Sequence, residues 1–375
     1  MIEREIKKNV QKKLFRNKAI VIIGARQVGK TTLLKMIAED YKGKSLYLNC
    51  DEPDVRSILT DITSTRLKTL FGKNKLILVD EAQRVKNIGI TLKIIVDELS
   101  DYQIVASGSS ALELANEISE PLTGRKYEFN LFPISWNEFA KEYGALEANR
   151  IIEERMLYGM YPEIIIKHDE KEELLKSLAQ SYLYKDVLSY SNIKKPELLE
   201  QLLKALALQI GNQVSYHELA KILRVDNQTI SKYVDLLEKA FVIFRLPPFS
   251  RNLRTELTKM RKIYFYDTGI RNSLIRNFYN LDMRQDVGAL WENFMISERM
   301  KMIKNTGLDV ESYFWRTQQQ QEIDYVEIAR NKISAFEFTL NPKMKKKISE
   351  TFINAYPKAK AIVINKDNYM GFLGL

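Results

Sequence analysis

The sequence predicts an α/β fold built around a parallel sheet, followed by smaller helical and α/β parts. A short β-branched run, Ala19–Ile23, precedes a glycine-containing loop and a segment with helix-spaced apolar residues. Other short apolar runs end in polar residues, at Asp80 and at Ser107. Short apolar runs that alternate with helical patterns are typical of buried parallel strands joined by crossover helices.

The loop after the first predicted strand satisfies the pattern G-x-x-x-x-G-K-[ST] at every position: Gly24, Ala25, Arg26, Gln27, Val28, Gly29, Lys30 and Thr31. We expect its glycines to let backbone N–H groups approach phosphate oxygens, and the helix entered at Thr32 to add the positive end of its dipole. Lys30 is expected to reach the β- and γ-phosphates, and the Thr31 hydroxyl to ligate Mg²⁺. A glycine turn with a chance lysine is the alternative, which the order strand, loop, helix disfavours.

An acidic pair follows the third predicted strand. Ser45–Asn49 and Lys75–Val79 are short apolar runs, and the second leads into Asp80-Glu81. Apolar residues followed by Asp-Glu form a Walker B pattern, in which Asp80 would hold the Mg²⁺ shell and Glu81 would polarise the attacking water. A strand end capped by two acids is the ordinary alternative. The position about 50 residues beyond the phosphate loop favours the functional interpretation.

A predicted helix, Ile88–Leu99, leads to a fourth strand, Tyr102–Ala106, and then to a serine-rich turn. Ser107 or Ser109 is expected to sense the γ-phosphate. A helix N-cap is the alternative for Ser109 and Ser110.

Arg125 stands directly before a fifth predicted strand, Lys126–Leu131. Two interpretations stay open for it. It acts as an arginine finger on the nucleotide of a neighbouring subunit, or it is a surface charge. The first interpretation requires the chain to assemble, and the second allows a monomer.

Several segments, in this order, resemble the AAA-type ATPases of bacteria and archaea that carry a C-terminal domain of unknown function. They are GARQVGKTTLL, LILVDEAQ, VASGSSALEL, LTGRKYEFNLFPISWNEF, YGMYPEI, SYLYKDVL, YFYDTGI, GALWENFMISE and YFWRTQQQQEIDYVEI. The resemblance covers nearly the whole chain. It implies an ATP-binding AAA-type domain (1–145), a helical region (146–205), a winged helix (206–266) and a nuclease-like domain (267–375), with ATP and Mg²⁺ as cofactors.

Composition limits the classes that remain. The chain has 375 residues, 45% of them apolar, which suffices for two or three domains with proper cores. We expect a cytoplasmic protein without a membrane segment, because no apolar run approaches about 18 residues and the charged N-terminus lacks a signal-peptide pattern. One cysteine, Cys50, fits a reducing compartment. The net charge of +10 favours a polyanionic partner.

Residues 150–210 have a helical pattern, in which Leu174, Leu175, Leu178, Leu183 and Leu188 are expected in the core. Beyond them the spacing is that of a helix-turn-helix. Ser215 is expected to cap a helix ending at Leu223, and a turn at 224–227 precedes a second helix. Polar residues suited to base edges and phosphates begin that helix: Gln228, Thr229, Ser231 and Lys232.

Two short strands, Phe241–Leu246 and Lys262–Tyr266, are expected to pair as a wing. Between them, residues 250–262 carry five basic residues and one acid. These features favour contact with double-stranded DNA. Service as a lid or packing module within the protein is the alternative.

The C-terminal part carries an incomplete nuclease signature. Asp324 lies in an alternating strand, and Glu337 lies in the next one. In PD-(D/E)xK nucleases, two such carboxylates hold Mg²⁺ while a lysine orients the attacking water. Here Thr339 stands at the lysine position, and Lys343 lies nearby in a predicted loop. The family resemblance suggests Glu292 as a third acid. We expect a degenerate metal site in a binding or structural module, with an active nuclease as the alternative.

The sequence therefore predicts a Mg²⁺-dependent ATPase whose nucleotide state switches the C-terminal parts on DNA or on a protein partner. ATP is favoured over GTP, since Asn365-Lys366-Asp367 departs from the guanine-specifying N-K-x-D at Asn368. Two alternatives are a DNA-binding regulator that holds ATP without hydrolysing it, and an ATP-controlled nuclease.

Overall fold

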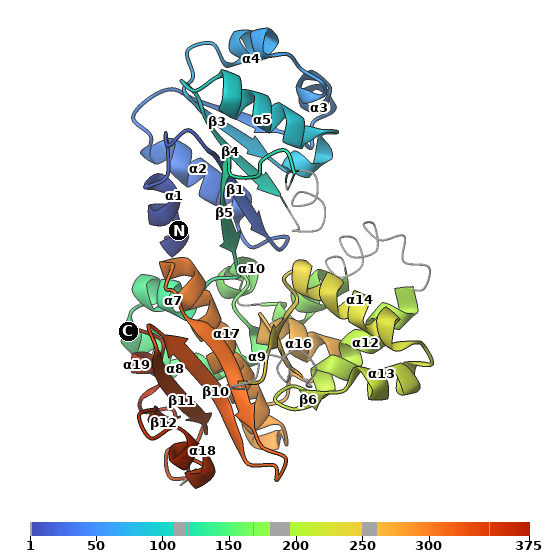
Figure 1. The fold of residues 1–375 in the computed structure, drawn as a ribbon, viewed down its shortest axis with the longest axis vertical. Helices are drawn as coiled ribbons and strands as arrows, with labels where there is room; N and C mark the ends of the chain where they lie inside the picture. The colour runs from blue at the N-terminus through green and yellow to red at the C-terminus, as the bar shows by residue number, and fades with distance from the viewer. Residues whose placement is uncertain are drawn as a thin grey trace. The chain divides into compact units, whose positions relative to one another are not determined.

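The computed structural model describes residues 2–108, 118, 120–167, 169–180, 196–249, 261–344 and 346–375 (Figure 1). The chain divides into two compact units, chiefly Met1–Pro133 and Ile134–Leu375. Some of the residues singled out in the sequence lie outside the described residues: Ser109, Ser110, Leu183, Leu188 and most of the basic segment at 250–262.

The first unit is built on a five-stranded sheet in the order β2-β3-β4-β1-β5, with every neighbouring pair parallel. Its strands are β1 (Ala19–Gly24), β2 (Ser45–Asn49), β3 (Leu76–Asp80), β4 (Gln103–Gly108) and β5 (Lys126–Leu131). The three inner strands are buried along their whole length, as short apolar runs in a covered parallel sheet should be. The parallel α/β sheet predicted from the sequence is therefore confirmed.

Helices cover both faces of this sheet. They are α1 (Glu5–Gln11), α2 (Lys30–Asp40), α3 (Pro53–Leu59), α4 (Ser64–Phe71), α5 (Ile88–Glu98) and the short η1 (Ala82–Arg84). The chain crosses from β1 to β2 in one direction and returns through β3 to β4 in the other. Right-handed crossovers then place α2 on one face and α3 to α5 on the other, where α4 packs on α5 (Figure 1). All five strands end at one edge, which is where α/β sheets form ligand sites.

Gly24 also has a packing role that the phosphate-loop pattern does not predict. It is the last residue of β1, and a Cβ built on it would lie 2.2 Å from the carbonyl oxygen of Leu131 on β5. Its missing side chain therefore makes room for a neighbouring strand. The tight part of the loop depends instead on Gln27 and Gly29, whose φ angles are 59° and 95°.

The second unit begins with helices, as expected for residues 150–210. These helices are α7 (Trp136–Tyr143), α8 (Ala145–Arg150), α9 (Ile152–Tyr158), α10 (Pro162–Ile166), residues 171–180 and α12 (Pro196–Leu208). Ser135 and Glu138 form a capping box at the start of α7. Leu175 and Leu178 are buried as expected, and Leu174 is partly exposed.

A three-stranded antiparallel sheet follows, in the order β6-β8-β7. Its elements are β6 (Gln213–Val214), α13 (Tyr216–Leu223), α14 (Asn227–Lys239), β7 (Ile243–Leu246) and β8 (Arg261–Phe265). The Ser215 hydroxyl caps α13 by accepting the Glu218 N–H at 3.3 Å. The helix pair and the pairing of β7 with β8, both expected from the sequence, are present.

The chain ends in a four-stranded sheet of order β12-β11-β10-β9, in which β11 and β12 are parallel and the other pairs antiparallel. The elements from β8 onward are α16 (Thr268–Leu274), η2 (Leu281–Met283), α17 (Val287–Thr306), β9 (Glu311–Arg316), β10 (Glu322–Ala329), β11 (Lys332–Phe338), α18 (Glu350–Ala355), β12 (Lys360–Ile364) and α19 (Tyr369–Phe372).

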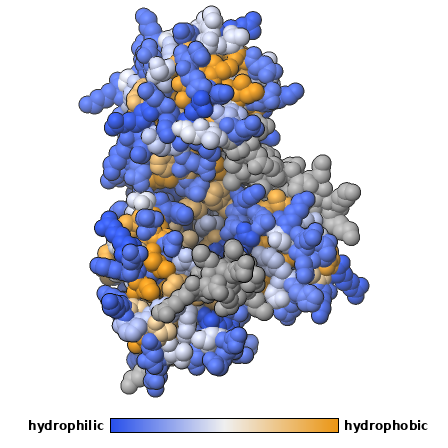
Figure 2. All heavy atoms as spheres, in the orientation of Figure 1, coloured by the Kyte–Doolittle hydropathy of each residue, from blue (hydrophilic) through white to orange (hydrophobic). Residues whose placement is uncertain are grey.

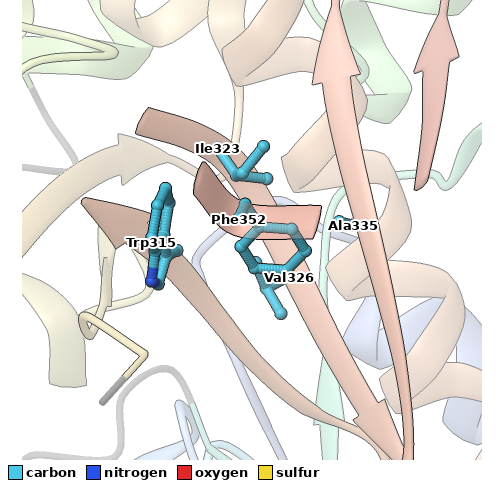
Figure 3. Packing of buried hydrophobic residues seen from close by; sticks show 5 residues of the cluster. All are labelled: Trp315, Ile323, Val326, Ala335 and Phe352. Atoms are coloured by element: carbon cyan, nitrogen blue, oxygen red, sulfur yellow. The ribbon is translucent and has the colours of Figure 1, made fainter. Parts of the chain in front are cut away.

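One face of this sheet packs on α18. The ring of Phe352 lies against β10 beside Ile323 and Val326, and Trp315 meets it edge-on at 5.1 Å between ring centroids (Figure 3). Ile323 and Val326 are three positions apart and yet share this face, because the pairing of β10 with β9 shifts register between them. Such a β-bulge changes the direction of the side chains inside it.

Polar and charged residues cover most of the face seen in Figure 2, with apolar patches between them. Among the described helices, none is both long and apolar enough to cross a membrane.

The contact between β1 and β5 generates a first prediction. Gly24→Ala should lower the stability of the first unit by about 1–3 kcal/mol, since its Cβ meets backbone rather than a movable side chain. Thermal unfolding measures the loss. Gly288→Ala is the control, because nothing lies within 4 Å of its Cβ, and it should change stability by less than about 1 kcal/mol. Equal unfolding temperatures for the two variants would contradict the argument.

Candidate functional site

The phosphate loop connects the carboxyl end of β1 to the start of α2. Gly29 precedes α2 in the left-handed conformation, so the first N–H groups of the helix begin directly after the turn. Lys30 is 5% exposed, and its ammonium donates to the carbonyl oxygens of Gly24 at 3.0 Å and Ala25 at 2.8 Å. The Lys30 ammonium therefore lies against the loop that the sequence assigns to phosphate.

Asp80 stands at the end of β3, 2% exposed, and its carboxylate gathers hydrogen bonds from three other segments. The Thr31 hydroxyl donates to Oδ2 at 2.6 Å, and the Tyr47 hydroxyl donates to the same oxygen at 2.7 Å. The Ser107 hydroxyl donates to Oδ1. The structure thus brings together Thr31, Asp80 and Ser107, which the sequence had predicted from separate motifs.

Tyr47 on β2 was not anticipated. Its place in a short alternating strand gave no functional signal, and only the pairing of β2 with β3 brings its hydroxyl to Asp80. Burial first, and then the hydrogen bond and the negative charge of Asp80, raise the pKa of Tyr47 far above its usual range. The phenol therefore stays protonated and serves as a donor to Asp80.

Cys50 follows β2, and its backbone N–H donates to the Asp80 carbonyl at 3.0 Å. Burial, followed by the charges of Asp80 and Asp51, raises the pKa of the Cys50 thiol to about 12. A thiol that stays protonated at neutral pH is a poor nucleophile, so Cys50 acts here through its backbone.

Glu81 adopts a left-handed backbone conformation with φ of 51° at the start of η1. Its N–H donates to Asp80 Oδ1 at 3.2 Å and to the Ser107 oxygen at 3.3 Å, and its carboxylate accepts the Gln83 amide at 2.6 Å. A non-glycine residue in this conformation costs on the order of 1 kcal/mol and persists where its neighbours hold it. The contacts of Asp80 and Ser107 therefore set the direction of Glu81.

Arg4 also contacts the loop, and the sequence gave no sign of it beyond a charged N-terminal segment. Its guanidinium donates to the Val28 carbonyl at 2.6 Å and to the Phe132 carbonyl at 2.6 Å, and the residue is 4% exposed. Arg4 thereby ties the phosphate loop to the chain just beyond β5.

Arg125 does not reach this site in its own chain. In the pairing of β1 with β5, Ala19 faces Lys126 and Gly24 faces Leu131. Arg125 therefore lies at the edge where the strands begin, whereas the phosphate loop lies at the edge where they end. The length of β5, about 3.3 Å for each residue, separates the two. Its side chain, 41% exposed, pairs with Asp97 at 2.7 Å. A role on the nucleotide of a neighbouring subunit stays a prediction.

The predicted acids of the second unit do meet. The Lys346 ammonium lies 2.5 Å from Asp324 Oδ2 and 2.6 Å from Glu337 Oε2. The buried Lys262 ammonium contacts Glu292 at 3.1 Å and Asp324 Oδ1 at 3.8 Å. The sequence pattern places the lysine at position 339, with Lys343 nearby, and predicts neither Lys262 nor Lys346.

Thr339 and Lys343, the two positions that the sequence pattern indicates, make other contacts or none with the cluster. The Thr339 hydroxyl donates to the Asn341 carbonyl at 3.4 Å, and Lys343 is exposed. A distant segment supplies Lys262, and a loop beyond β11 supplies Lys346. The Glu-x-Lys pattern relates residues two positions apart, so it cannot predict Lys262 or Lys346.

Burial and charge set the protonation of this cluster. Burial, together with the negative charge of Asp324, raises the pKa of Glu292 and of Glu337. Burial opposes ionisation of Asp324 as well, but the ammonium groups of Lys262 and Lys346 outweigh it and hold its pKa below the usual range. Asp324 is therefore the ionised centre of the cluster.

The strand, phosphate loop, helix and acidic strand end of the first unit define a P-loop nucleotide site in a parallel α/β sheet. Comparison with known families agrees with this class. Residues 16–140 match a model described as an AAA domain. Residues 149–281 and 287–372 match two domains of unknown function (DUF8612 and DUF4143).

Proteins of similar sequence align with most of the chain. An uncharacterized protein of Methanocaldococcus jannaschii is 28% identical and aligns over 94% of this chain and 81% of its own length. One from Mycobacterium tuberculosis is 26% identical over 87% of this chain and 71% of its length. A Walker-type ATPase of Pyrococcus abyssi shares the fold at a TM-score of 0.52 and 16% identity, covering 73% of this chain and 96% of that one. The domain match and the shared fold support an AAA-type P-loop ATPase.

The Arg4 contacts generate a second prediction. Arg4→Met should destabilise the first unit by about 2 kcal/mol and weaken nucleotide binding, because two carbonyls that border the loop lose a charged donor. Chemical unfolding and a nucleotide titration measure the two effects. Lys8→Met, an exposed position on α1, the helix that begins directly after Arg4, is the control. If both variants behave like the parent, Arg4 does not support the loop.

Proposed function

We propose that this protein is a Mg²⁺-dependent ATPase whose nucleotide state controls binding by its second unit. The hydrogen bond between Thr31 and Asp80 carries the proposal, because it joins the phosphate loop to the acidic strand end. A Walker A hydroxyl and a Walker B carboxylate in contact form the oxygen-rich donor set that Mg²⁺ prefers. The residues therefore fit the metal and the nucleotide that the motifs imply.

Each residue of the site has a distinct role. The backbone N–H groups of residues 25–30 and the Lys30 ammonium would bind phosphate oxygens, and Thr31 with Asp80 would hold Mg²⁺. The metal, when bound, neutralises charge on the β- and γ-phosphates. Glu81 orients the attacking water and accepts its proton. Ser107 and Tyr47 hold the Asp80 carboxylate in place.

ATP binding and turnover test these roles. Lys30→Ala should weaken ATP binding by about 10- to 100-fold, since a charge-assisted hydrogen bond contributes about 1.5–3 kcal/mol. Glu81→Gln should keep ATP affinity and lower turnover by about 100-fold or more. A titration with labelled ATP and a steady-state phosphate-release assay measure the two effects.

Lys42→Ala is the matched control, because it removes an exposed lysine just beyond α2. Unchanged ATP affinity in Lys30→Ala would sink the assignment of the loop. Normal turnover in Glu81→Gln would remove its role as base. Tight ATP binding with no turnover in the parent chain would favour a regulator that holds ATP without hydrolysing it.

The DNA part of the proposal rests on α13 and α14. These helices and the β6-β8-β7 sheet have the element order of a winged helix, and Gln228 and Lys232 are exposed on α14. Thr229 is less available than expected, because its backbone N–H and its hydroxyl both donate to Asp226, at 2.7 and 2.9 Å. The net charge of +10 also favours a polyanionic partner.

Salt dependence tests this part. Lys232→Ala should weaken binding to duplex DNA and reduce the slope of log K against log salt by about 1, as expected for one lost phosphate contact. Lys204→Ala removes the same charge from α12, where the ammonium pairs with Glu200, and should leave the slope unchanged. A protein partner becomes the better proposal if neither variant alters DNA binding, or if the rate of ATP hydrolysis is the same with and without DNA.

A further inference from the structure

The carboxylate cluster of the second unit contains its own cations. Four acids contribute to it from α17, β10 and β11, namely Glu292, Glu322, Asp324 and Glu337, and two lysines lie among them. The lysines come from different places: Lys262 from β8 and Lys346 from the loop after β11.

The β-bulge in β10 places Asp324 at the centre of this cluster. The bulge lies between Ile323 and Val326, and it frees Asp324 from the regular ladder. Asp324 Oδ2 instead accepts the backbone N–H of Phe338 on β11 at 3.0 Å. One carboxylate thus touches both strands, and each of its oxygens also meets a different lysine.

Lys262 is a fixed part of the protein interior. Its side chain is 1% exposed, and its ammonium contacts Glu292, Glu322 and Asp324. The Tyr264 hydroxyl donates to the same Glu292 oxygen at 2.6 Å. A buried ammonium with three carboxylates around it cannot leave without exposing uncompensated charge, so Lys262 stays in every folded state.

Lys346 differs from Lys262 in its access to water. Its side chain is 36% exposed, whereas the acids that it joins, Asp324 and Glu337, are 9% and 5% exposed. Its ammonium also donates to the Phe338 carbonyl at 3.2 Å. Lys346 therefore closes the cluster from the solvent side and is the member that can swing away.

We propose that Lys262 and Lys346 occupy, as ammonium groups, the place that a divalent cation would take between Glu292, Asp324 and Glu337. The nuclease-like pattern of acids implies a metal, and the residues present do not fit one. Both oxygens of Asp324 already carry an ammonium contact, and the metal would have to displace at least Lys346. Within the described part of the chain, no group of three His, Cys, Asp or Glu is arranged to hold a metal ion.

Removal of Lys346 should open the site. In Lys346→Met, Asp324 Oδ2 and Glu337 lose their cation and face the solvent side, so a divalent ion can replace it. We expect this variant to gain a Mn²⁺ site with affinity at least about tenfold above the parent, which corresponds to about one lost competing ion pair. Electron paramagnetic resonance of free Mn²⁺ counts the sites.

The parent for this experiment is the full chain with Asp80→Asn and without nucleotide, so that the first unit does not contribute Mn²⁺ sites. Lys343→Met is the matched control in the same loop and should gain nothing. Lys346→Met combined with Glu337→Gln should lose the gained site. Circular dichroism checks that each variant folds, and Lys346→Gln replaces Lys346→Met if the latter does not.

Two results would overturn the proposal. One is a Mn²⁺ site in the parent chain that Glu337→Gln removes, because it would mean that the lysines do not exclude metal. The other is a folded Lys346 variant without any gain in Mn²⁺ binding. A gain that Glu337→Gln reverses supports the proposal and makes metal-dependent cleavage by the parent site untenable.

Discussion

The first unit depends on the hydrogen bonds that the Asp80 carboxylate accepts. This carboxylate lies at the end of β3 and accepts hydrogen bonds from Thr31 after β1, Tyr47 on β2 and Ser107 on β4. A buried carboxylate is costly unless donors surround it, so strand order and register must bring all of these ends together. The parallel sheet provides this arrangement, because the carboxyl ends of its strands share one edge. The same contacts determine the direction of Glu81.

Local patterns predicted much of this unit. β2 and β5 have the bounds expected from their apolar runs, and the phosphate loop lies between β1 and α2 as its spacing indicates. These features depend on residues close together in the chain. The role of Gly24 did not follow from the motif, because the atom that excludes a side chain there belongs to Leu131, on another strand.

The residues that the sequence did not reveal act over long separations. Arg4 donates to backbone carbonyls, which leave no pattern of side chains to recognise. Tyr47 reaches Asp80 only through the pairing of β2 with β3. Lys346 supplies the ammonium group that the nuclease pattern would have placed at position 339. It can do so because the flexible stem of a lysine lets the ammonium reach a carboxylate from a neighbouring segment.

Asp80 and Asp324 are both buried carboxylates, but different kinds of group compensate their charges. The hydrogen bonds to Asp80 come from hydroxyl and N–H groups, which are neutral, so its negative charge stays available to a cation. Asp324 forms ion pairs with the ammonium groups of Lys262 and Lys346, whose positive charges offset its own. A buried charge is tolerated where an opposite charge compensates it, and at Asp324 the two ammonium groups supply that charge. The proposed Mg²⁺ chemistry therefore belongs to the first unit, whereas the acids of the second unit are held in an internal ion network.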